Sequence, residues 1–396
     1  MDNSKKFYWH IKNGKIADIK YPVKGNYMLL PYGKKLMNNL FLKLINRFKI
    51  ENYNEVEFPE IIPESFTKHI KEMNLFKIKN PHGISYLAPS FEFTSSYLAS
   101  LLIKDNTDTP LKIYYCGKVR RQTTKRALIK NMEFKICEFN SFFDNEKELI
   151  KEHKKINDII SKLLDDFNIP FIKVKDKLGQ HKFYAFFPSL NIFGATFASV
   201  IINDRFTKYF FSDNLFKVNQ LNFSFTDRML SAYLDNHKDE KGFLIENDIL
   251  PFKVAIPSME FSKRELNNLI KILKQGNIEY IILNMKNNKF FYEWFNSSGI
   301  PLSLSIGKSQ LSLRIRKKNK VVWTDYKNIK SEIIKALKIN IKRKNNIKIM
   351  KLDKNIKNFE DGVIYISKNK FKSYDDLLKE IGITDEGYHA YLTKKI

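Results

Sequence analysis

The sequence has few cysteines. Cys116 and Cys137 are the only two in 396 residues. Two thiols cannot build a disulfide framework, and no second CxxC or His pair stands near them to complete a zinc site. The composition therefore favours a reducing compartment. It also predicts that side chains bind no metal, zinc included.

Long apolar runs are also absent. No stretch reaches the roughly 18 consecutive apolar residues that a membrane-spanning helix requires. The first residues, Met1 to Lys6, are polar and charged, without an apolar core behind them. We therefore expect a soluble, cytoplasmic protein with no membrane partner.

Acidic residues are scarce relative to basic ones. The chain has 43 Asp and Glu against 69 Lys and Arg, a formal net charge of +26. Such an excess favours a polyanionic partner, with nucleic acid first among the candidates. A genome biased toward A and T enriches Lys and Asn without selection for function. This second explanation of the charge stays open.

The chain has enough apolar residues for a sizeable core. Hydrophobic residues make up 43% of it and aromatic residues 14%, and its length suggests two or three domains. Apolar side chains recur at helical spacing from Pro31 to Phe48 and from Glu146 to Phe167. Strand patterns occur at Glu55 to Phe58 and at Leu111 to Tyr115, and the basic segment Lys118 to Lys130 predicts a charged hairpin.

The pattern changes after Pro251. Strand, helix, strand and helix patterns follow one another at Phe252 to Ile256, Lys263 to Gln275, Tyr280 to Leu283 and Phe290 to Asn296. This order is typical of a small α/β domain with a mostly parallel sheet.

Several segments resemble one family in the same order along the chain. They are Tyr21 to Gly33, the helix and strand that end at Pro59, the stretch Pro110 to Tyr114, and Phe290 to Gly307. In this order and spacing they resemble class II aminoacyl-tRNA synthetases, specifically prolyl-tRNA synthetases of the archaeal and eukaryotic type.

The resemblance implies an α+β/α/β architecture. An antiparallel-sheet catalytic domain (residues 1–250) is followed by a small α/β anticodon-binding domain (251–345) and a reduced C-terminal extension without zinc ligands (346–396). It also implies a homodimer, because the first class II motif builds the dimer interface in this family.

The resemblance further implies where ATP binds. Arg121, within Val119 to Thr123, falls on the phosphate-binding arginine of the second class II motif, and Arg228 falls on the arginine of the third. Arginine suits the chemistry because its planar fork binds phosphate bidentately and stabilises transition-state charge. Both are therefore the expected catalytic residues. Glu133 and Thr226 complete the implied ATP site, with Mg²⁺ accompanying ATP.

The implied amino-acid pocket contains Ser90, Glu92, Glu138 and Asn191. Ser90 and Glu92 lie in Leu87 to Glu92, which is similar to the family's Arg-Pro-Thr-Ser-Glu signature. They keep a hydroxyl and a carboxylate that can pair with a substrate ammonium. Glu138 matches a carboxylate of a second family pattern, and Asn191 stays close in kind to a substrate-contacting strand residue.

Other positions depart from the family. Ala88, Ile136 and Asn140 stand where the family has Arg, Trp and His. Thr123 replaces a glutamate that contacts the adenine amino group, and Ser224 replaces a glycine that lets the backbone approach ATP. Loss of one transition-state contact commonly lowers a rate about a hundredfold, and several losses need not add.

The small domain carries the implied tRNA contacts. Gly307 to Gln310 aligns with the stretch that reads anticodon guanines in the family, which makes Lys308 and Gln310 candidates. The basic residues of the segment that follows are Arg314, Arg316, Lys317 and Lys318.

Two functions remain open. The first is a divergent proline–tRNA ligase, favoured by the retained Arg121 and Arg228. The second is a catalytically inactive paralogue that binds tRNA or another nucleic acid as an accessory protein. It is favoured by the changes at Thr123 and Ser224.

Overall fold

The chain contains two compact units. The computed structural model describes residues 2–67, 75–81, 83–122, 127–175, 180–190, 192–202, 206–211, 217–307, 310–338, 363–365 and 389–392. Unit 1 comprises Met1–Lys20, Met28–Lys43 and Leu234–Asn346, and unit 2 comprises Tyr21–Tyr27, Leu44–Tyr233 and Ile347–Ile396. The domain boundaries expected after residues 250 and 345 stay predictions.

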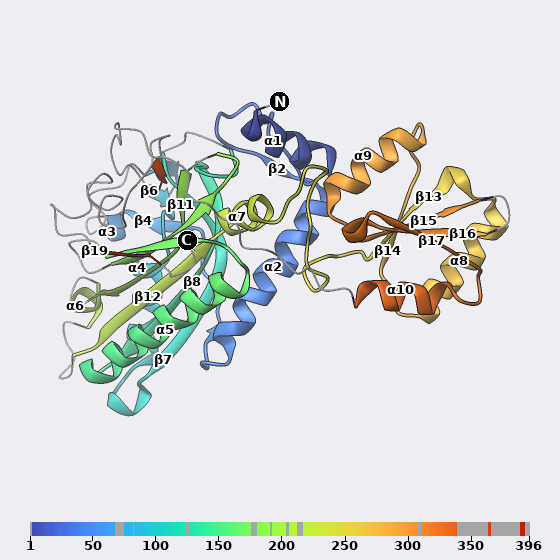
Figure 1. The fold of residues 1–396 in the computed structure, drawn as a ribbon. Coiled ribbons are helices and arrows are strands. Elements are labelled where there is room, and N and C mark those ends of the chain that lie inside the picture. Colours follow the sequence, from blue (N-terminus) through green and yellow to red (C-terminus); the bar gives the residue numbers. More distant parts are fainter. Residues whose placement is uncertain are drawn as a thin grey trace, which may run out of the picture. The chain divides into compact units, whose positions relative to one another are not determined.

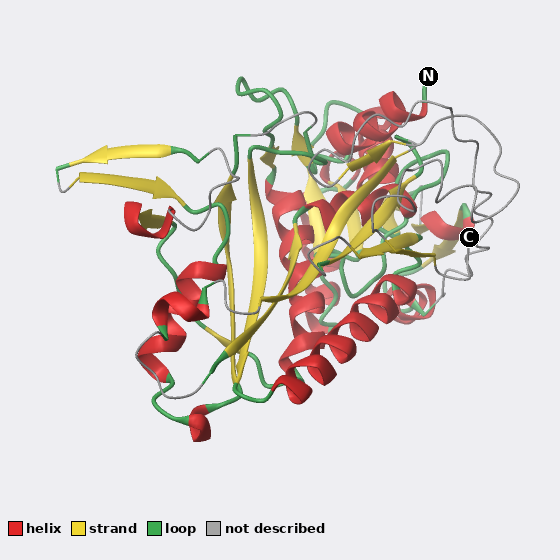
Figure 2. Ribbon diagram, turned by 90° about the vertical axis from the view of Figure 1, so that its left-hand side faces the viewer, coloured by secondary structure: helices red, strands yellow, loops and turns green. Residues whose placement is uncertain are grey.

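Unit 2 is built on a largely antiparallel sheet (Figures 1 and 2). Its strands are hydrogen-bonded in the order β19-β9-β10-β11-β12-β8-β7-β3, with β18 beside β11, and only β3 and β7 run parallel. The strands are β3 Asn54–Glu55, β7 Leu111–Arg120, β8 Glu133–Phe143, β9 Phe171–Lys175, β10 His181–Phe187, β11 Ile192–Ile202, β12 Asn219–Thr226, β18 Val363–Tyr365 and β19 His389–Leu392. A smaller sheet joins β4 (Ile61–Pro63), β6 (Gly83–Leu87) and β5 (Lys77–Asn80).

An aromatic ladder crosses one face of the larger sheet. Tyr114, Phe139 and Phe223 lie directly opposite one another on β7, β8 and β12. Their rings are stacked, with centroids 5.0 Å apart for Tyr114 and Phe139 and 4.6 Å apart for Phe139 and Phe223. Cross-strand aromatic pairs of this kind stabilise a sheet beyond the area that they bury.

Helices cover both faces of this sheet. On the face of the ladder lies α5 (Glu146–Asp166), which begins after its N-cap residue Asn145 and whose Asn157 accepts a hydrogen bond from Ser199 of β11 at 3.2 Å. The opposite face packs against α4 (Glu92–Leu102) through a cluster that includes Phe91, Ala99 and Ile136. The other helical segments that include unit 2 residues are α2 Pro31–Lys49, α3 Glu64–Thr67, η1 Asn106–Asp108, α6 Thr207–Phe210 and α7 Arg228–Asn236.

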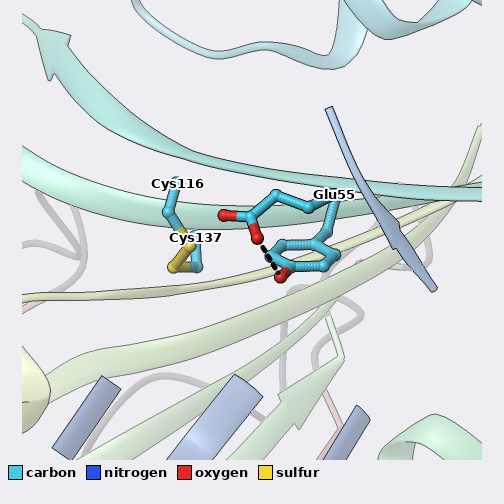
Figure 3. The surroundings of a disulfide bond; sticks show 4 residues. Glu55, Cys116 and Cys137 are labelled. Atoms are coloured by element: carbon cyan, nitrogen blue, oxygen red, sulfur yellow. Dashed lines mark hydrogen bonds between the residues drawn. A yellow bond between two sulfur atoms is a disulfide. The ribbon is translucent and has the colours of Figure 1, made fainter. Parts of the chain in front are cut away.

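Cys116 and Cys137 form a disulfide, a pairing that the sequence analysis does not predict. The two residues are directly opposite on β7 and β8, with their Cα atoms 4.1 Å apart. Figure 3 shows this bond together with the nearby hydrogen bond of 2.8 Å from the Tyr114 hydroxyl to Glu55. Sequence spacing alone does not reveal that two strand residues are in register.

Unit 1 contains a mixed sheet in the order β14-β13-β15-β16-β17. Its elements are α1 Asn3–Asn13, β1 Ala17–Asp18, β2 Met28–Leu29, β13 Val254–Pro257, η2 Ser258–Glu260, α8 Lys263–Gln275, β14 Tyr280–Leu283, α9 Asn288–Ser298, β15 Leu302–Ile306, β16 Leu311–Ile315, η3 Arg316–Lys318, β17 Lys320–Thr324 and α10 Ile329–Leu337. Local signals fix several helix ends. Ser262 and Glu265 form a capping box at α8, and Gly299, with φ of 79°, ends α9 in the left-handed conformation.

The structure corrects two sequence predictions of local structure. The strand expected at Glu55 to Phe58 is only Asn54–Glu55, because Phe58 leaves the sheet to pack on Phe91 and Tyr115, with ring centroids 6.2 and 5.4 Å away. The sheet of unit 1 is parallel only around β13, since short connections make β15, β16 and β17 antiparallel. Within the described residues, no helix is both long and apolar enough to cross a membrane.

Removal of the central ring of the ladder should destabilise unit 2. Phe139→Ala takes away a fully buried ring that contacts both neighbouring strands, so we expect the free energy of unfolding to fall by about 3–5 kcal/mol. Urea denaturation followed by far-ultraviolet circular dichroism measures it. Ile150→Ala, at a side chain that is 54% exposed on α5, is the control. A loss below about 1 kcal/mol for Phe139→Ala would contradict the role of the ladder.

Candidate active site

Polar side chains line one face of the unit 2 sheet. Along β12, Gln220 and Asn222 alternate with apolar residues, and Asn222 lies directly opposite Asn140 of β8. Ser224 is likewise opposite Glu138. Because successive strand residues point to opposite faces, these five side chains share one face.

Three amides of this face are hydrogen-bonded together. The side-chain nitrogens of Gln220 and Asn222 donate to Asn140 Oδ1 at 2.7 and 2.9 Å, and Ser96 of α4 donates to Gln220 Oε1 at 2.7 Å. All four side chains are buried. Gln220 and Asn222 are not among the site residues predicted from the sequence. The signal that could have found them is the alternation of polar residues in an otherwise apolar strand.

Glu138 joins the sheet to the start of α4. Both of its carboxylate oxygens accept the backbone N–H of Phe91 at 3.1 Å, and Ser90 Oγ donates to Oε2 at 3.3 Å. Ser90 Oγ also accepts the backbone N–H of Glu92 at 3.2 Å. The structure therefore brings together three of the predicted substrate-binding residues, Ser90, Glu92 and Glu138.

Two carboxyl groups close together make this place electrostatically unusual. Burial of Glu138, followed by the negative charge of Glu92, raises the pKa of Glu138 to about 8. The N–H of Phe91, the side chain of Asn140 and the positive charge of Arg121 act in the opposite direction. At pH 7 Glu138 therefore mostly holds a proton, and a cation placed beside it would favour the charged form.

Arg121 is held between the loop before α4 and the sheet. Its Nε donates to the carbonyl oxygen of Pro89 at 3.1 Å, and its guanidinium lies 5.4 Å from the ring centroid of Phe134. Its charge lowers the pKa of both Glu138 and Arg228. The two predicted catalytic arginines are thus close enough to interact electrostatically, and Arg121 also acts on the Glu138 carboxyl.

Arg228 is the first residue of α7, and its side chain runs along β11. Its guanidinium donates to the backbone carbonyls of Ile129 and Ala195. Gly194 leaves room for it, because a Cβ there would lie 3.1 Å from Arg228 Cδ. Burial, reinforced by the charge of Arg121, lowers the pKa of Arg228 to about 10, so this side chain stays positively charged at neutral pH.

The two other predicted ATP-binding residues differ in their surroundings. Thr226 ends β12, and its Oγ1 is buried without a hydrogen-bond partner among the residues that the structure describes. Glu133 is instead paired with Lys118 Nζ at 2.6 Å and Arg120 Nε at 2.9 Å. Burial opposes the effect of these two cations, but they lower the pKa of Glu133 overall.

The predicted tRNA contacts in unit 1 also differ from one another. Gln310 and Lys318 are exposed, whereas Arg316 is buried and binds both carboxylate oxygens of Asp239, at 2.8 and 2.6 Å. Arg314 lies over the ring of Tyr292, 4.6 Å from its centroid. Arg316 therefore holds unit 1 together, and its contact with RNA stays a prediction. Of the other predicted site residues, Lys317 is half-buried, and Asn191 and Lys308 lie outside the described residues.

Comparison with known proteins shows that the chain is similar to one family. No family model matches the chain. A proline–tRNA ligase of Methanococcus maripaludis strain C5 is 26% identical over 387 residues, covering 87% of this chain and 82% of that protein. One of Pyrobaculum neutrophilum is 24% identical, covering 85% of this chain and 78% of that protein. A prolyl-tRNA synthetase from Cryptosporidium parvum, solved with L-proline and AMP, has a TM-score of 0.70 at 17% identity, covering 84% of this chain and 77% of that one. The chain is a divergent relative of the archaeal-type prolyl-tRNA synthetases.

For this prolyl-tRNA synthetase relative, the fold predicted from the sequence is confirmed. Unit 2 has the antiparallel sheet, and unit 1 the small sheet with helices, that were expected for a class II synthetase fold. In the described part of the chain, no group of three or more His, Cys, Asp or Glu could hold a metal ion. The expected absence of zinc stays a prediction.

The raised pKa of Glu138 should make stability depend on pH. The folded chain holds this proton at pH values where the unfolded chain has released it, so the wild type loses stability as pH rises from about 5 to about 8. Relative to Glu138→Gln, the free energy of unfolding should fall by at most about 1.4 kcal/mol per pH unit. Denaturant titrations at several pH values measure this difference.

The matched control is Glu133→Gln, because the pKa of Glu133 is lowered rather than raised. Its stability relative to the wild type should not change in this way between pH 5 and 8. If the free energies of unfolding of the wild type and Glu138→Gln differ by the same amount at every pH from 5 to 8, Glu138 is already ionised in the folded chain at pH 5.

Proposed function

We propose that this chain activates proline with ATP and transfers the prolyl group to tRNA. The observation that carries the proposal is that Arg121 interacts electrostatically with both Glu138 and Arg228, while Glu92 acts on the same Glu138 carboxyl. Proline brings an ammonium and a carboxylate to such a site, and ATP brings phosphates. Both reactants therefore find groups of opposite charge.

The first step joins two anions. An oxygen of the proline carboxylate attacks the α-phosphorus of ATP, the bond from that phosphorus to the bridging oxygen breaks, and pyrophosphate leaves. Arg121 and Arg228 would stabilise the negative charge on the phosphoryl oxygens as it develops. The Thr226 hydroxyl would donate a hydrogen bond to the nucleotide, which gives its buried Oγ1 a partner.

The second step uses the prolyl-adenylate. A ribose hydroxyl of the tRNA attacks the prolyl carbonyl carbon and its proton passes to solvent. The bond from that carbon to the phosphate oxygen breaks, and AMP leaves. Throughout both steps Glu138 and Glu92 would hold the substrate ammonium. An ammonium beside Glu138 favours its charged form, so binding of proline would displace the proton that Glu138 holds in the free chain.

The partners and location follow from the same proposal. The tRNA is expected to be tRNA-Pro, the chain to act as a homodimer, and the location to be cytoplasmic. Mg²⁺ would arrive with ATP, because this ion is commonly held by substrate phosphates and only one or two carboxylates. No zinc is expected.

A nucleic-acid-binding paralogue without ligase activity is the second candidate. Glu133, expected to contact ATP, already pairs with Lys118 and Arg120, which favours this alternative. The pyrophosphate exchange assay separates the two functions, since only the ligase forms an adenylate.

The proposed ligase should catalyse proline-dependent exchange of pyrophosphate into ATP. Arg121→Ala should lower the exchange rate about a hundredfold or more, because it removes a charge that stabilises the transition state. Arg47→Ala is the control, since Arg47 makes a surface ion pair of 3.1 Å with Asp166 in the same unit. Its rate should equal that of the wild type.

Wild-type exchange that does not respond to proline at saturating ATP would leave the paralogue as the function. Exchange that survives in Arg121→Ala would remove this arginine from the phosphate site.

Basic residues after β16 should bind RNA phosphates. The logarithm of tRNA affinity should fall linearly with the logarithm of salt concentration, by about 0.7–0.9 for each phosphate contacted. Replacement of Lys317, Lys318 and Lys320 by Ser should therefore reduce the slope by about two, as measured by filter binding. Three exposed lysines of α5 provide a control of equal charge: Lys151, Lys154 and Lys162. Equal effects of the two triple variants would attribute the salt dependence to net charge alone.

A further inference from the structure

An open cavity lies within unit 1, formed by residues that the proposed ligase reaction does not use. Its volume is about 360 Å³, within the range of small-molecule sites. Lys6, Trp9 and His10 line it from α1, Glu240 and Lys241 from the turn before Gly242, and Glu293 and Asn296 from α9.

Tight packing fixes the walls of this cavity. Gly242 has φ of +149°, and a Cβ at this position would lie 2.1 Å from the carbonyl oxygen of Asn296. Only glycine lets the turn approach α9 so closely. The same turn is held by the bidentate pair of Asp239 with Arg316 and by the hydrogen bond of 2.9 Å from Lys241 Nζ to Asn319 Oδ1. The cavity is therefore preformed.

His10 is the group that indicates a ligand. Its side chain is almost completely buried, and its Nδ1 lies 3.1 Å from Ser297 Oγ. Its Nε2 is buried without a hydrogen-bond partner among the residues that the structure describes, an arrangement that costs free energy unless a water molecule or a ligand supplies the partner. Burial, followed by the charge of Lys6, lowers the pKa of His10 to about 4. The ring is thus neutral at pH 7.

The charges around the cavity define the kind of ligand. Glu240 pairs with Lys6, so these two charges offset each other. Glu293 makes no ion pair or hydrogen bond with another described residue, and its carboxylate can accept hydrogen bonds only. A ligand would therefore meet an indole wall, a neutral imidazole nitrogen, an amide and an acceptor carboxylate. The two lysines and two glutamates of the lining cancel, which does not favour a polyanion.

We propose that this cavity binds one unpaired nucleobase that carries an exocyclic amino group. The flat base would pack against Trp9, the amino group would donate to Glu293 as it does to carboxylates in nucleic-acid complexes, and a ring nitrogen would complete the hydrogen bonds of His10. The base can come from a free nucleoside or from RNA. Asn319 directly follows η3. Its hydrogen bond with Lys241 therefore joins the edge of the cavity to the basic segment that is expected to contact tRNA.

Cytidine and uridine test the proposal, because they have the same size and only cytidine has the amino group. Ligand-observed NMR titrations of the full chain should give a dissociation constant about tenfold lower for cytidine than for uridine. Glu293→Gln should abolish this preference, and Trp9→Ala should weaken binding of both nucleosides. The control is Trp323→Ala, at an indole that is 59% exposed elsewhere in unit 1. It should change neither the affinity for the two nucleosides nor the preference for cytidine.

The affinity of tRNA for Trp9→Ala distinguishes the sources. If Trp9→Ala binds tRNA about tenfold more weakly than the wild type at constant salt, the base belongs to RNA. If the tRNA affinity is unchanged while the wild type still prefers cytidine, the ligand is a free nucleoside. Equal affinity of the wild type for cytidine and uridine would overturn the proposal, as would a preference that survives Glu293→Gln. If free L-proline competes with cytidine, and Glu293→Gln removes this competition, the cavity binds an amino acid and not a nucleobase. Pyrophosphate exchange is independent of all of these outcomes, so the ligase proposal and this one can fail separately.

Discussion

Burial of the Glu138 carboxyl is the constraint on which the rest of the candidate site depends. A carboxyl group inside a sheet must be hydrogen-bonded or neutral, and here both conditions contribute. The N–H of Phe91 and the hydroxyl of Ser90 bind it, while burial and Glu92 favour its protonated form. These bonds fix the start of α4 on the sheet. They also fix the preceding loop, whose Pro89 carbonyl positions Arg121.

The sheet of unit 2 keeps stability and chemistry on separate faces. Stacked rings of Tyr114, Phe139 and Phe223 fill the face toward α5, whereas Glu138 and the amide network occupy the face toward α4. The face toward α4 combines its polar strip with an apolar cluster. In a strand one substitution affects only one face. Such separation lets polar residues change on the face of the candidate site without loss of the aromatic core, consistent with a fold that is shared at 17% sequence identity.

The sequence predicts much of the fold because local signals decide it. The helix at Lys263–Gln275 and the strand at Tyr280–Leu283 were predicted with the observed bounds, since capping residues and apolar periodicity act over a few residues. Strand register is set by the whole sheet, so the disulfide and the Asn140, Gln220 and Asn222 network were missed. The resemblance located Ser90, Glu92 and Glu138 together. It could not reveal that Arg316 is buried against Asp239, because that pairing depends on tertiary packing.

In the proposed reaction, the protonated Glu138 of the free chain meets the ammonium of proline, and Arg121 and Arg228 meet the phosphate. The most direct measurement is calorimetric titration with the sulfamoyl analogue of prolyl-adenylate at pH 7, in buffers that differ in ionisation enthalpy. The wild type should bind the analogue with release of protons. Glu138→Gln should release fewer, because its side chain has no proton to lose. Equal proton release by wild type and Glu138→Gln would show that Glu138 does not lose a proton to the ligand, and no binding by the wild type would exclude the proposed prolyl-adenylate site.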